Sequence, residues 1–415
     1  MRIIASSFLA TVLLVGTAAA QEPPSLTLND VFAAIRSSHP ALAASRAEAE
    51  AARARIVQEK AWMDPKVSVE LRREDTLRVD TYSEIEVTAS QELPLSRRNK
   101  LRSEAAAAEA SVADATISVR ERDLFNQARN SYVRIAAVDA KSAVNERLRG
   151  LLKQTITLTQ QAYERGQRMQ ADLIAAQAEL ARLDAEQSDL AGMRAEDVTK
   201  LNALMQRAPE TPISVLKLPE VHSLTISPAE ALAHARAHNP ELVRAARKVK
   251  SAEAQLAIAE KNRIPDPEVM IRGRQMNRSG DVLSSYDTGV AFSLPWFNEK
   301  RNRAQRAEAR SMIAAARADA QMTESELAGM VAGMIQRINI SAAQVARFRN
   351  QILPLAEQQA ATQRHAYESG QAPLLEVIMA QRTLLETEMK LVEAHSEHAL
   401  ASAAYDFMTA TDVTL

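Results

Sequence analysis

The chain has 415 residues with 51 basic and 52 acidic side chains, and its formal net charge of −1 gives no indication of nucleic-acid binding. It contains no cysteine, which excludes disulfides, thiol catalysis, cysteine-bound metals and a lipid-bearing N-terminal cysteine. With only 10 glycines and 4% aromatic residues, the composition is typical of long helices packed along a narrow apolar seam.

The N-terminus has the pattern of a secretory signal peptide. Arg2 supplies a positive charge, Ile3–Val15 form an apolar run, and Ala18–Ala20 resemble a small-residue cleavage site. We therefore expect residues 1–20 to be removed on export, leaving a mature chain from Gln21; a buried N-terminal helix is the alternative. No other window holds about 18 consecutive apolar residues, so no transmembrane helix is predicted.

Four landmarks occur twice in the same order, at offsets between 200 and 204 residues, which indicates an internal duplication. The matching segments are Leu26–Leu42 with Leu224–Leu242, Met63–Arg72 with Pro265–Arg274, Ser90–Ala105 with Ala291–Ala309, and YERGQ at Tyr163–Gln167 with YESGQ at Tyr367–Gln371. We assign residues 21–206 to the first repeat, 224–415 to the second, and the proline-containing segment 207–223 to a linker.

Each repeat is predicted to contain a helix, two strands and two long helices. In the first repeat, Asp30–Met63 has a helical pattern with a break at His39–Pro40. Alternating apolar and polar residues then predict strands at 67–72 and 84–89. The second repeat shows the same alternation more weakly, at 268–272 and 289–294.

Two long helices follow the strands. Almost nothing between Arg97 and Gly166 breaks a helix, and such a run extends on the order of 100 Å. A second helix runs from Asp172 to about Met205, and its apolar heptad positions predict an antiparallel coiled coil. These positions are Leu173, Ala176, Leu180, Leu183, Leu190, Leu201 and Leu204. Gly166, like Gly370 in the second repeat, marks the turn where the chain doubles back.

Two strands per repeat give four per chain, too few to close a barrel. Open sheet edges are not tolerated in lipid, whereas three chains together would supply 12 strands, a number found in outer-membrane barrels. The predicted fold is therefore mainly α with a small β part: an internally duplicated chain whose long antiparallel helices form an α-barrel, and whose four strands contribute to a trimeric 12-stranded outer-membrane β-barrel. A soluble four-stranded sheet on a coiled coil is the alternative.

The strand-to-helix junctions QELPL (Gln91–Leu95) and SLPWFNEKRN (Ser293–Asn302), with the duplicated plan and the two YxxGQ turns, resemble the TolC family of outer-membrane efflux proteins. The resemblance covers essentially all of the mature chain. It implies a homotrimer in outer-membrane lipid with a helical tunnel in the periplasm, docked on a periplasmic adaptor and an inner-membrane pump. The junctions look most like the heavy-metal (CzcC/CusC-like) branch, whose pumps are of the RND type.

The resemblance also implies a periplasmic aperture near the helix turns. By position, its acids are Asp172 and Glu376, with Tyr163 and Tyr367 on the preceding turns; Met379 stands where relatives often have a further acid. A ring of acids at a constriction favours cations. The alternatives are solvated charges near helix N-termini and tyrosines that pack beneath the turns. The implied adaptor contacts are the turn residues Arg165, Gly166, Gln167, Ser369, Gly370 and Gln371.

No catalytic or cofactor motif is evident: the chain has no phosphate-binding glycine loop, nucleophile elbow or HExxH sequence. We therefore expect neither an enzyme nor a cofactor. His234 and His238, four apart on a predicted helix, are weak metal-ligand candidates. At the equivalent positions the first repeat has Ala34 and Ser38. No third ligand is evident either, so no metal site is predicted.

The function predicted from the sequence is a passive exit duct in a tripartite efflux system. It would export substrates delivered by an RND-type pump and an adaptor, with heavy-metal cations as one candidate. The alternative is a periplasmic coiled-coil scaffold or adaptor without a conducting pore. An adaptor should carry glycine-rich lipoyl-like and small β-barrel segments, for which 10 glycines are too few.

Overall fold

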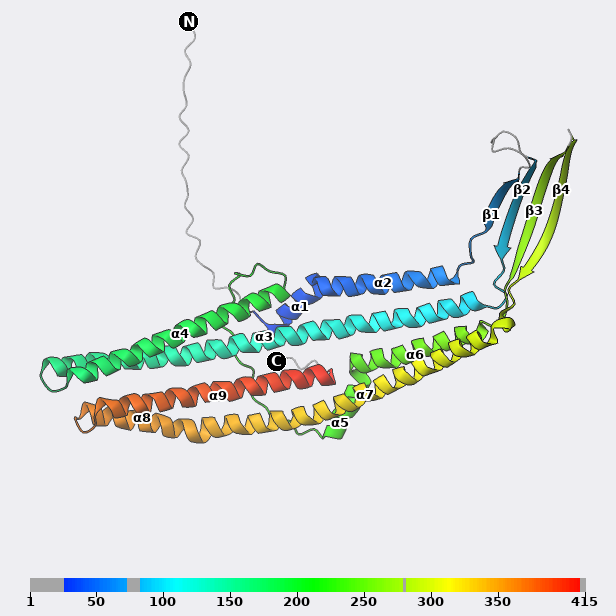
Figure 1. Ribbon diagram of the computed structural model, residues 1–415. Coiled ribbons are helices and arrows are strands. Elements are labelled where there is room, and N and C mark those ends of the chain that lie inside the picture. The colour runs from blue at the N-terminus through cyan, green and yellow to red at the C-terminus, as the bar shows by residue number, and fades with distance from the viewer. Residues whose placement is uncertain (1–25, 73–82, 279–280, 411–415) are drawn as a thin grey trace, which may run out of the picture.

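The computed structural model describes residues 26–72, 83–278 and 281–410. They form a long helical body with a small sheet projecting from one end (Figure 1). The signal peptide predicted at residues 1–20 lies outside the described residues. None of the helices in these ranges is long and apolar enough to cross a membrane.

The predicted order of elements is confirmed in both repeats. The first repeat contains α1 (Leu28–Ser38), α2 (Pro40–Lys60), β1 (Lys66–Arg72), β2 (Glu84–Glu92), α3 (Arg98–Glu164) and α4 (Gln170–Leu204). The second contains α5 (Pro228–His238), α6 (Pro240–Lys261), β3 (Pro267–Arg278), β4 (Asp281–Phe292), the 3₁₀ turn η1 (Pro295–Asn298), α7 (Glu299–Arg347), the π-helical turn η2 (Phe348–Ile352), α8 (Leu353–Glu368) and α9 (Leu374–Thr409). The 67 residues of α3 extend about 100 Å.

At the predicted helix break, His39–Pro40, a single residue caps two helices: His39 ends α1 and precedes the first residue of α2. His39 Nδ1 accepts a hydrogen bond from the Ala41 amide at 3.1 Å, and Pro40 occupies the first turn of α2, where its missing N–H costs nothing. Asn239 repeats the arrangement two hundred residues later, accepting from the Glu241 amide at 2.8 Å. Sequence duplication is therefore matched by duplicated local structure.

The four strands of the described ranges form one antiparallel sheet in the order β1-β2-β3-β4. The β2–β3 contact joins the two repeats, with Val87 opposite Gly273. β3 and β4 each have 12 residues, so the weak alternation at 268–272 and 289–294 underestimated their length. β1 and β4 are the sheet edges, and neither has a second strand partner among the described residues.

The second repeat contains one extra residue in its long helix. Ile135 and the equally buried Ile338 lie 203 positions apart, whereas Leu152 and Ala356, further along the same seam, lie 204 apart. Between them, the π-helical turn Phe348–Ile352 absorbs the added residue. This keeps the apolar seam aligned on both sides of the insertion.

The core is a narrow seam between helical hairpins. α3 packs against α2, α4, α6 and α9, and the cluster nearest the turns includes Ala176, Leu374 and Val377. The predicted α4 seam is correct at Ala176, Leu183, Leu190 and Leu201, but Glu179 takes the buried position in place of Leu180. Residues 207–223, assigned to a linker, have no helix or strand.

Candidate functional site

The sheet has two chemically different faces. Neighbouring residues of a strand point to opposite faces, and cross-strand partners share one. One face carries exposed aliphatic side chains, those of Val67, Val69, Leu71, Val87, Ile271 and Val290. The other carries charged residues that pair across the strands: Arg272 Nε lies 2.9 Å from Glu86 Oε1, and Arg274 Nε lies 2.8 Å from Glu84 Oε1.

An apolar face backed by a polar, ion-paired face is the pattern of a membrane barrel wall, whose outer surface meets lipid and whose inner surface meets water. In the part of the chain that the structure describes, the outer edges of β1 and β4 have no strand partner, and lipid does not tolerate backbone N–H and C=O groups left unpaired. The sheet is therefore suited to a barrel assembled from several copies.

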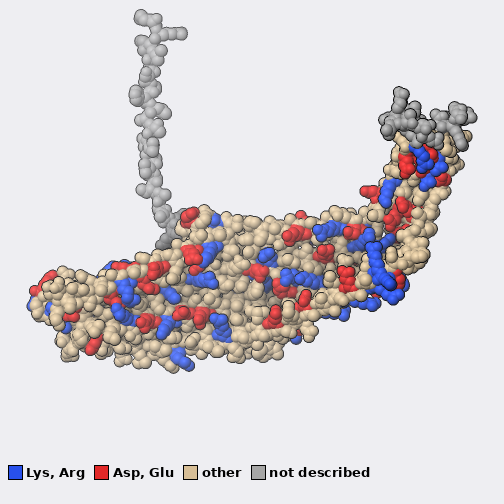
Figure 2. Space-filling view, in the orientation of Figure 1, with Lys and Arg blue, Asp and Glu red and all other residues tan. Residues whose placement is uncertain are grey.

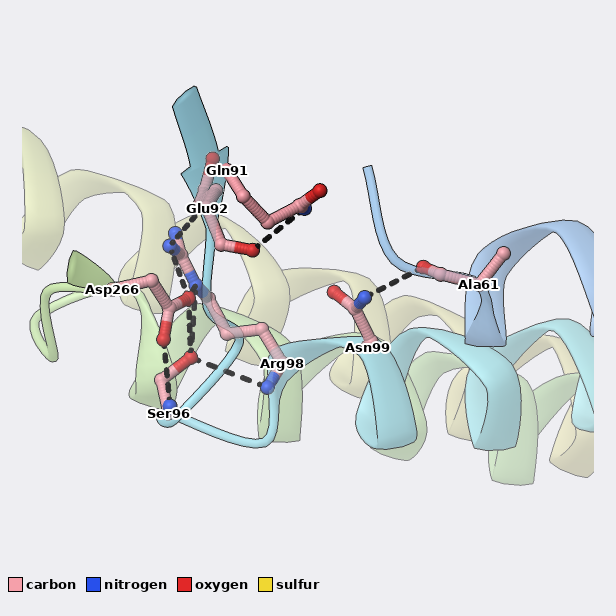
Figure 3. Close-up of polar contacts among 7 residues, drawn as sticks. All are labelled: Ala61, Gln91, Glu92, Ser96, Arg98, Asn99 and Asp266. Atoms are coloured by element: carbon pink, nitrogen blue, oxygen red, sulfur yellow. Dashed lines mark hydrogen bonds and ion pairs between the residues drawn. The ribbon is translucent and has the colours of Figure 1, made fainter. Parts of the chain in front are cut away.

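A buried carboxylate fastens the sheet to the helical body at the neck (Figure 3). Asp266, just before β3, accepts hydrogen bonds from the Ser96 amide at 2.6 Å, the Ser96 hydroxyl at 2.7 Å and Arg98 Nε at 2.9 Å. Burial alone would raise the pKa of Asp266, but the hydrogen bonds from Ser96 and the Arg98 guanidinium outweigh it and hold the pKa below its ordinary value. We call this contact the neck clasp.

Further polar contacts brace the same region. Asn99 Nδ2 donates to the Ala61 carbonyl at 2.7 Å (Figure 3). Gln91 Nε2 donates to the Met63 carbonyl at 2.7 Å. Lys and Arg side chains gather where the helices meet the sheet (Figure 2). The neck is thus a hydrogen-bonded joint, rich in basic side chains, between the two parts of the molecule.

The two helix turns at the opposite end are built alike. Gly166 and Gly370 have φ of +70° and +79°, the left-handed conformation expected at these turns. In each turn the glutamine amide closes the helix: Gln167 N donates to Ala162 O at 2.9 Å, and Gln371 N donates to Ala366 O at 2.8 Å. The turn residues of both loops, including Arg165 and Ser369, are exposed.

The two tyrosines before the turns have different surroundings. Tyr367 is 6% exposed; its hydroxyl lies 2.8 Å from Thr159 Oγ1, and the Arg168 guanidinium lies 4.3 Å from the centre of its ring. Arg168 Nη2 also donates to the Tyr367 carbonyl at 2.9 Å. Tyr163, by contrast, is 41% exposed. Tyr367 therefore links the second hairpin to the first, whereas Tyr163 faces outward.

Asp172 and Glu376 occupy the same position, the third residue of α4 and of α9. The residues before these helices, Met169 and Pro373, provide no side-chain cap, so an acid in the first turn is favoured by the helix dipole. Asp172 is partly exposed and Glu376 exposed, and neither carboxylate has a partner among the described residues. Met379 is 58% exposed, in place of a further acid.

A buried acid that the sequence reasoning missed joins the hairpins two turns further along α4. Glu179 is 6% exposed and accepts hydrogen bonds from Arg182 Nη2 of α4 at 2.8 Å and from Arg382 Nε of α9 at 3.0 Å. Burial would raise the pKa of Glu179, but the two arginines together lower it below its ordinary value. The feature of the sequence that could have revealed Glu179 is its place as an acidic residue between Ala176 and Leu183 on the apolar seam.

His234 and His238 stack with ring centroids 4.4 Å apart. His234 Nδ1 lies 3.0 Å from the Thr409 carbonyl, and His238 Nδ1 lies 3.0 Å from the His234 carbonyl. In the described part of the chain, no group of three or more histidine or acidic side chains could hold a metal. The two rings therefore have ordinary structural partners.

A helical body with paired glycine turns at one end and a two-faced sheet at the other is the arrangement expected of an outer-membrane efflux protein. The chain belongs to the outer membrane efflux protein family, whose model matches residues 32–206 and 231–410, once in each repeat. This is a family of transport proteins rather than enzymes, and it places the chain in the outer membrane. A comparison with curated protein sequences finds no match.

Solved structures share the fold. The outer-membrane channel OprN is 17% identical, with a TM-score of 0.77 over 92% of this chain and 89% of its own. The outer-membrane protein VceC of Vibrio cholerae is 18% identical, with a TM-score of 0.75 over 92% and 95%. CusC, whose structures concern transmembrane channel formation, is 15% identical, with a TM-score of 0.79 over 94% and 95%.

Proposed function

We propose that the chain is the passive exit duct of a tripartite efflux system, with three copies forming one pore. The observation that carries this proposal is the two-faced sheet, which has an exposed aliphatic face, an ion-paired polar face and two open edges. Three copies would pair the edges into a 12-stranded barrel, and their helices would enclose a periplasmic tunnel. A scaffold without a pore would have no use for an aliphatic sheet face exposed to water.

The partners proposed with this function are a periplasmic adaptor and an inner-membrane RND-type pump, which would supply the energy and most of the substrate choice. The exposed glycine turns, farthest from the sheet, are the surfaces available to the adaptor. Heavy-metal cations are one candidate substrate class, because the strand-to-helix junctions resemble that branch.

The decisive experiment isolates the full-length protein from outer-membrane fractions and tests it in planar bilayers. We expect a heat-sensitive trimer band on a gel and stepwise conductance after reconstitution. A chain that is monomeric and water-soluble without detergent would contradict the proposal, and a membrane-bound trimer that conducts no current would favour the scaffold alternative.

Replacing both Asp172 and Glu376 with alanine is expected to weaken the cation preference of the pore. These acids have no partner among the described residues, so in a trimer they would offer unneutralised negative charge near the turns. The measurement is the reversal potential in a KCl gradient, with Glu186→Ala, an exposed acid farther along α4, as the matched control. An unchanged reversal potential would show that the pair does not line the aperture.

Replacing Gly370 with valine is expected to abolish efflux while leaving trimers intact. A Cβ at this position would meet no atom within 4 Å, so the change acts through the left-handed backbone, at a cost of about 1–2 kcal/mol. Gly370→Asn, which tolerates this conformation better, is the control. Cellular accumulation of a pump substrate would be measured beside the cognate pump and adaptor; normal efflux in the valine variant would separate this turn from docking.

A further inference from the structure

The neck clasp joins one repeat to the other within a single chain. Asp266 belongs to the segment leading into β3 in the second repeat, and Arg98 begins α3 in the first. Each has a counterpart: Asp64-Pro65 matches Asp266-Pro267 at an offset of 202, and Arg98-Asn99 matches Arg301-Asn302 at an offset of 203. The duplicated chain therefore carries the two halves of a second clasp, Asp64 and Arg301.

These two residues are unused within the chain. Asp64 and Arg301 are both exposed, and neither has a hydrogen-bond or ion-pair partner among the described residues. Asp64 precedes β1 and Arg301 follows β4, and these two strands form opposite edges of the sheet.

We propose that Asp64 of one copy binds Arg301 of the neighbouring copy, so that the neck clasp is repeated at every joint between subunits. This inference rests on the proposed function, since it requires copies arranged edge to edge. The partner it identifies is a second copy of the same chain, and the surfaces in contact are the β1 edge with its preceding loop and the β4 edge with the start of α7.

The strand register supports the same placement independently. Within the chain, Ala89 of β2 lies opposite Ile271 of β3. Their counterparts at offsets of 201 and 202 are Val290 of β4 and Val69 of β1, so the repeated contact places Val290 opposite Val69 of the neighbour. Both are exposed on the aliphatic face, at 56% and 62%, as a shared barrel wall requires.

The joint between copies would contain fewer hydrogen bonds than the neck clasp within a copy. Ser96, which gives Asp266 two hydrogen bonds, corresponds to Phe297 at the offset of 201 set by Pro94 and Pro295. The 3₁₀ turn η1 also takes the place of the short turn that joins strand to helix in the first repeat. The contact is therefore reduced to the ion pair between Asp64 and Arg301.

The absence of native cysteines makes the joint directly testable. One copy carrying Asp64→Cys and a second, differently tagged copy carrying Arg301→Cys would be expressed together and treated with a short bifunctional maleimide. We expect a cross-linked band containing both tags. The matched control replaces Asp64→Cys with Glu186→Cys, on α4 far from the neck, and should give none.

Charge reversal supplies a second readout. Asp64→Arg and Arg301→Asp should each lower the temperature at which trimers dissociate, and the two changes combined should restore it. A wild-type chain that forms no trimer would overturn the proposed function itself. Normal wild-type trimers without the mixed cross-link, or single reversals that the double variant does not rescue, would overturn only this joint.

Discussion

Replacing Asp266 with alanine is expected to lower the dissociation temperature of the proposed trimer sharply. The Asp266 side chain is 2% exposed and that of Arg98 is 21% exposed. Removing the carboxylate leaves the guanidinium and the Ser96 amide without their acceptor, and breaking a buried pair in this way costs about 3–5 kcal/mol. We expect the lower end, about 3 kcal/mol, because Arg98 retains some contact with water.

Two variants separate the clasp from general damage at the neck. Asp266→Asn keeps the size and part of the hydrogen bonding, so its effect should be intermediate; Glu59→Ala, at an exposed position on α2, should change nothing. The measurement is the loss of the trimer band with temperature. An asparagine variant as stable as the wild type would show that the charge pair with Arg98 contributes little.

The clasp also predicts a pH dependence. The pKa of Asp266 is held below its ordinary value of 3.8, so the carboxylate binds fewer protons in the folded state than in the unfolded state. Its contribution is therefore complete above pH 3.8 and is lost as the pH falls through the lower folded value. The difference in dissociation temperature between the wild type and Asp266→Asn should narrow only at such acidic pH.

The helical architecture was predictable because its signals are local. Prolines, capping residues and two turn glycines mark where helices begin and end, and the uninterrupted stretch before Gly166 fixes the length of α3. The duplication strengthened each weak signal, because an element uncertain in one repeat could be checked against its counterpart. Helix order and strand number followed from this comparison.

Features set by tertiary contact escaped the prediction. Nothing local distinguishes Tyr163 from Tyr367, since both precede a glycine turn; only the packing of the second hairpin on the first buries Tyr367 against Thr159. The π-helical turn at Phe348–Ile352, followed by Pro354, is a one-residue insertion visible only once buried positions are aligned. Glu179 was missed because the heptad frame admitted Leu180 and had no place for a buried acid.

Replacing Arg382 with alanine is expected to open the turn end of the proposed channel. Glu179 is held by two arginines, but only Arg382 comes from α9 and so connects the second hairpin to α4. A charge-assisted hydrogen bond contributes about 1.5–3 kcal/mol. Because the Arg382 side chain is 51% exposed, we expect the lower end, which corresponds to about a tenfold increase in the ratio of open to closed channels.

Arg182→Ala is the matched control for this variant. It removes a comparable bond to the same carboxylate, but Arg182 and Glu179 lie three residues apart on one helix, so the connection between hairpins survives. Single-channel recordings should therefore show a higher open probability for Arg382→Ala and almost none of this change for Arg182→Ala. Equal behaviour of the two variants would show that the contact between α4 and α9 does not restrain the turns.

Lowering the pH should raise the open probability, as the loss of Arg382 does, only under strongly acidic conditions. The pKa of Glu179 lies below its ordinary value of 4.5 because the hydrogen bonds and charges of its two arginines exceed the effect of burial. The folded-state pKa is lowered, so the link persists from neutral pH to 4.5 and is lost as the pH falls through the lower folded value. Wild-type open probability should stay flat over that range and rise below it, whereas the Arg382→Ala variant, already released, should show a weaker rise. A transition near neutral pH would instead point to a histidine and remove Glu179 from control of the opening.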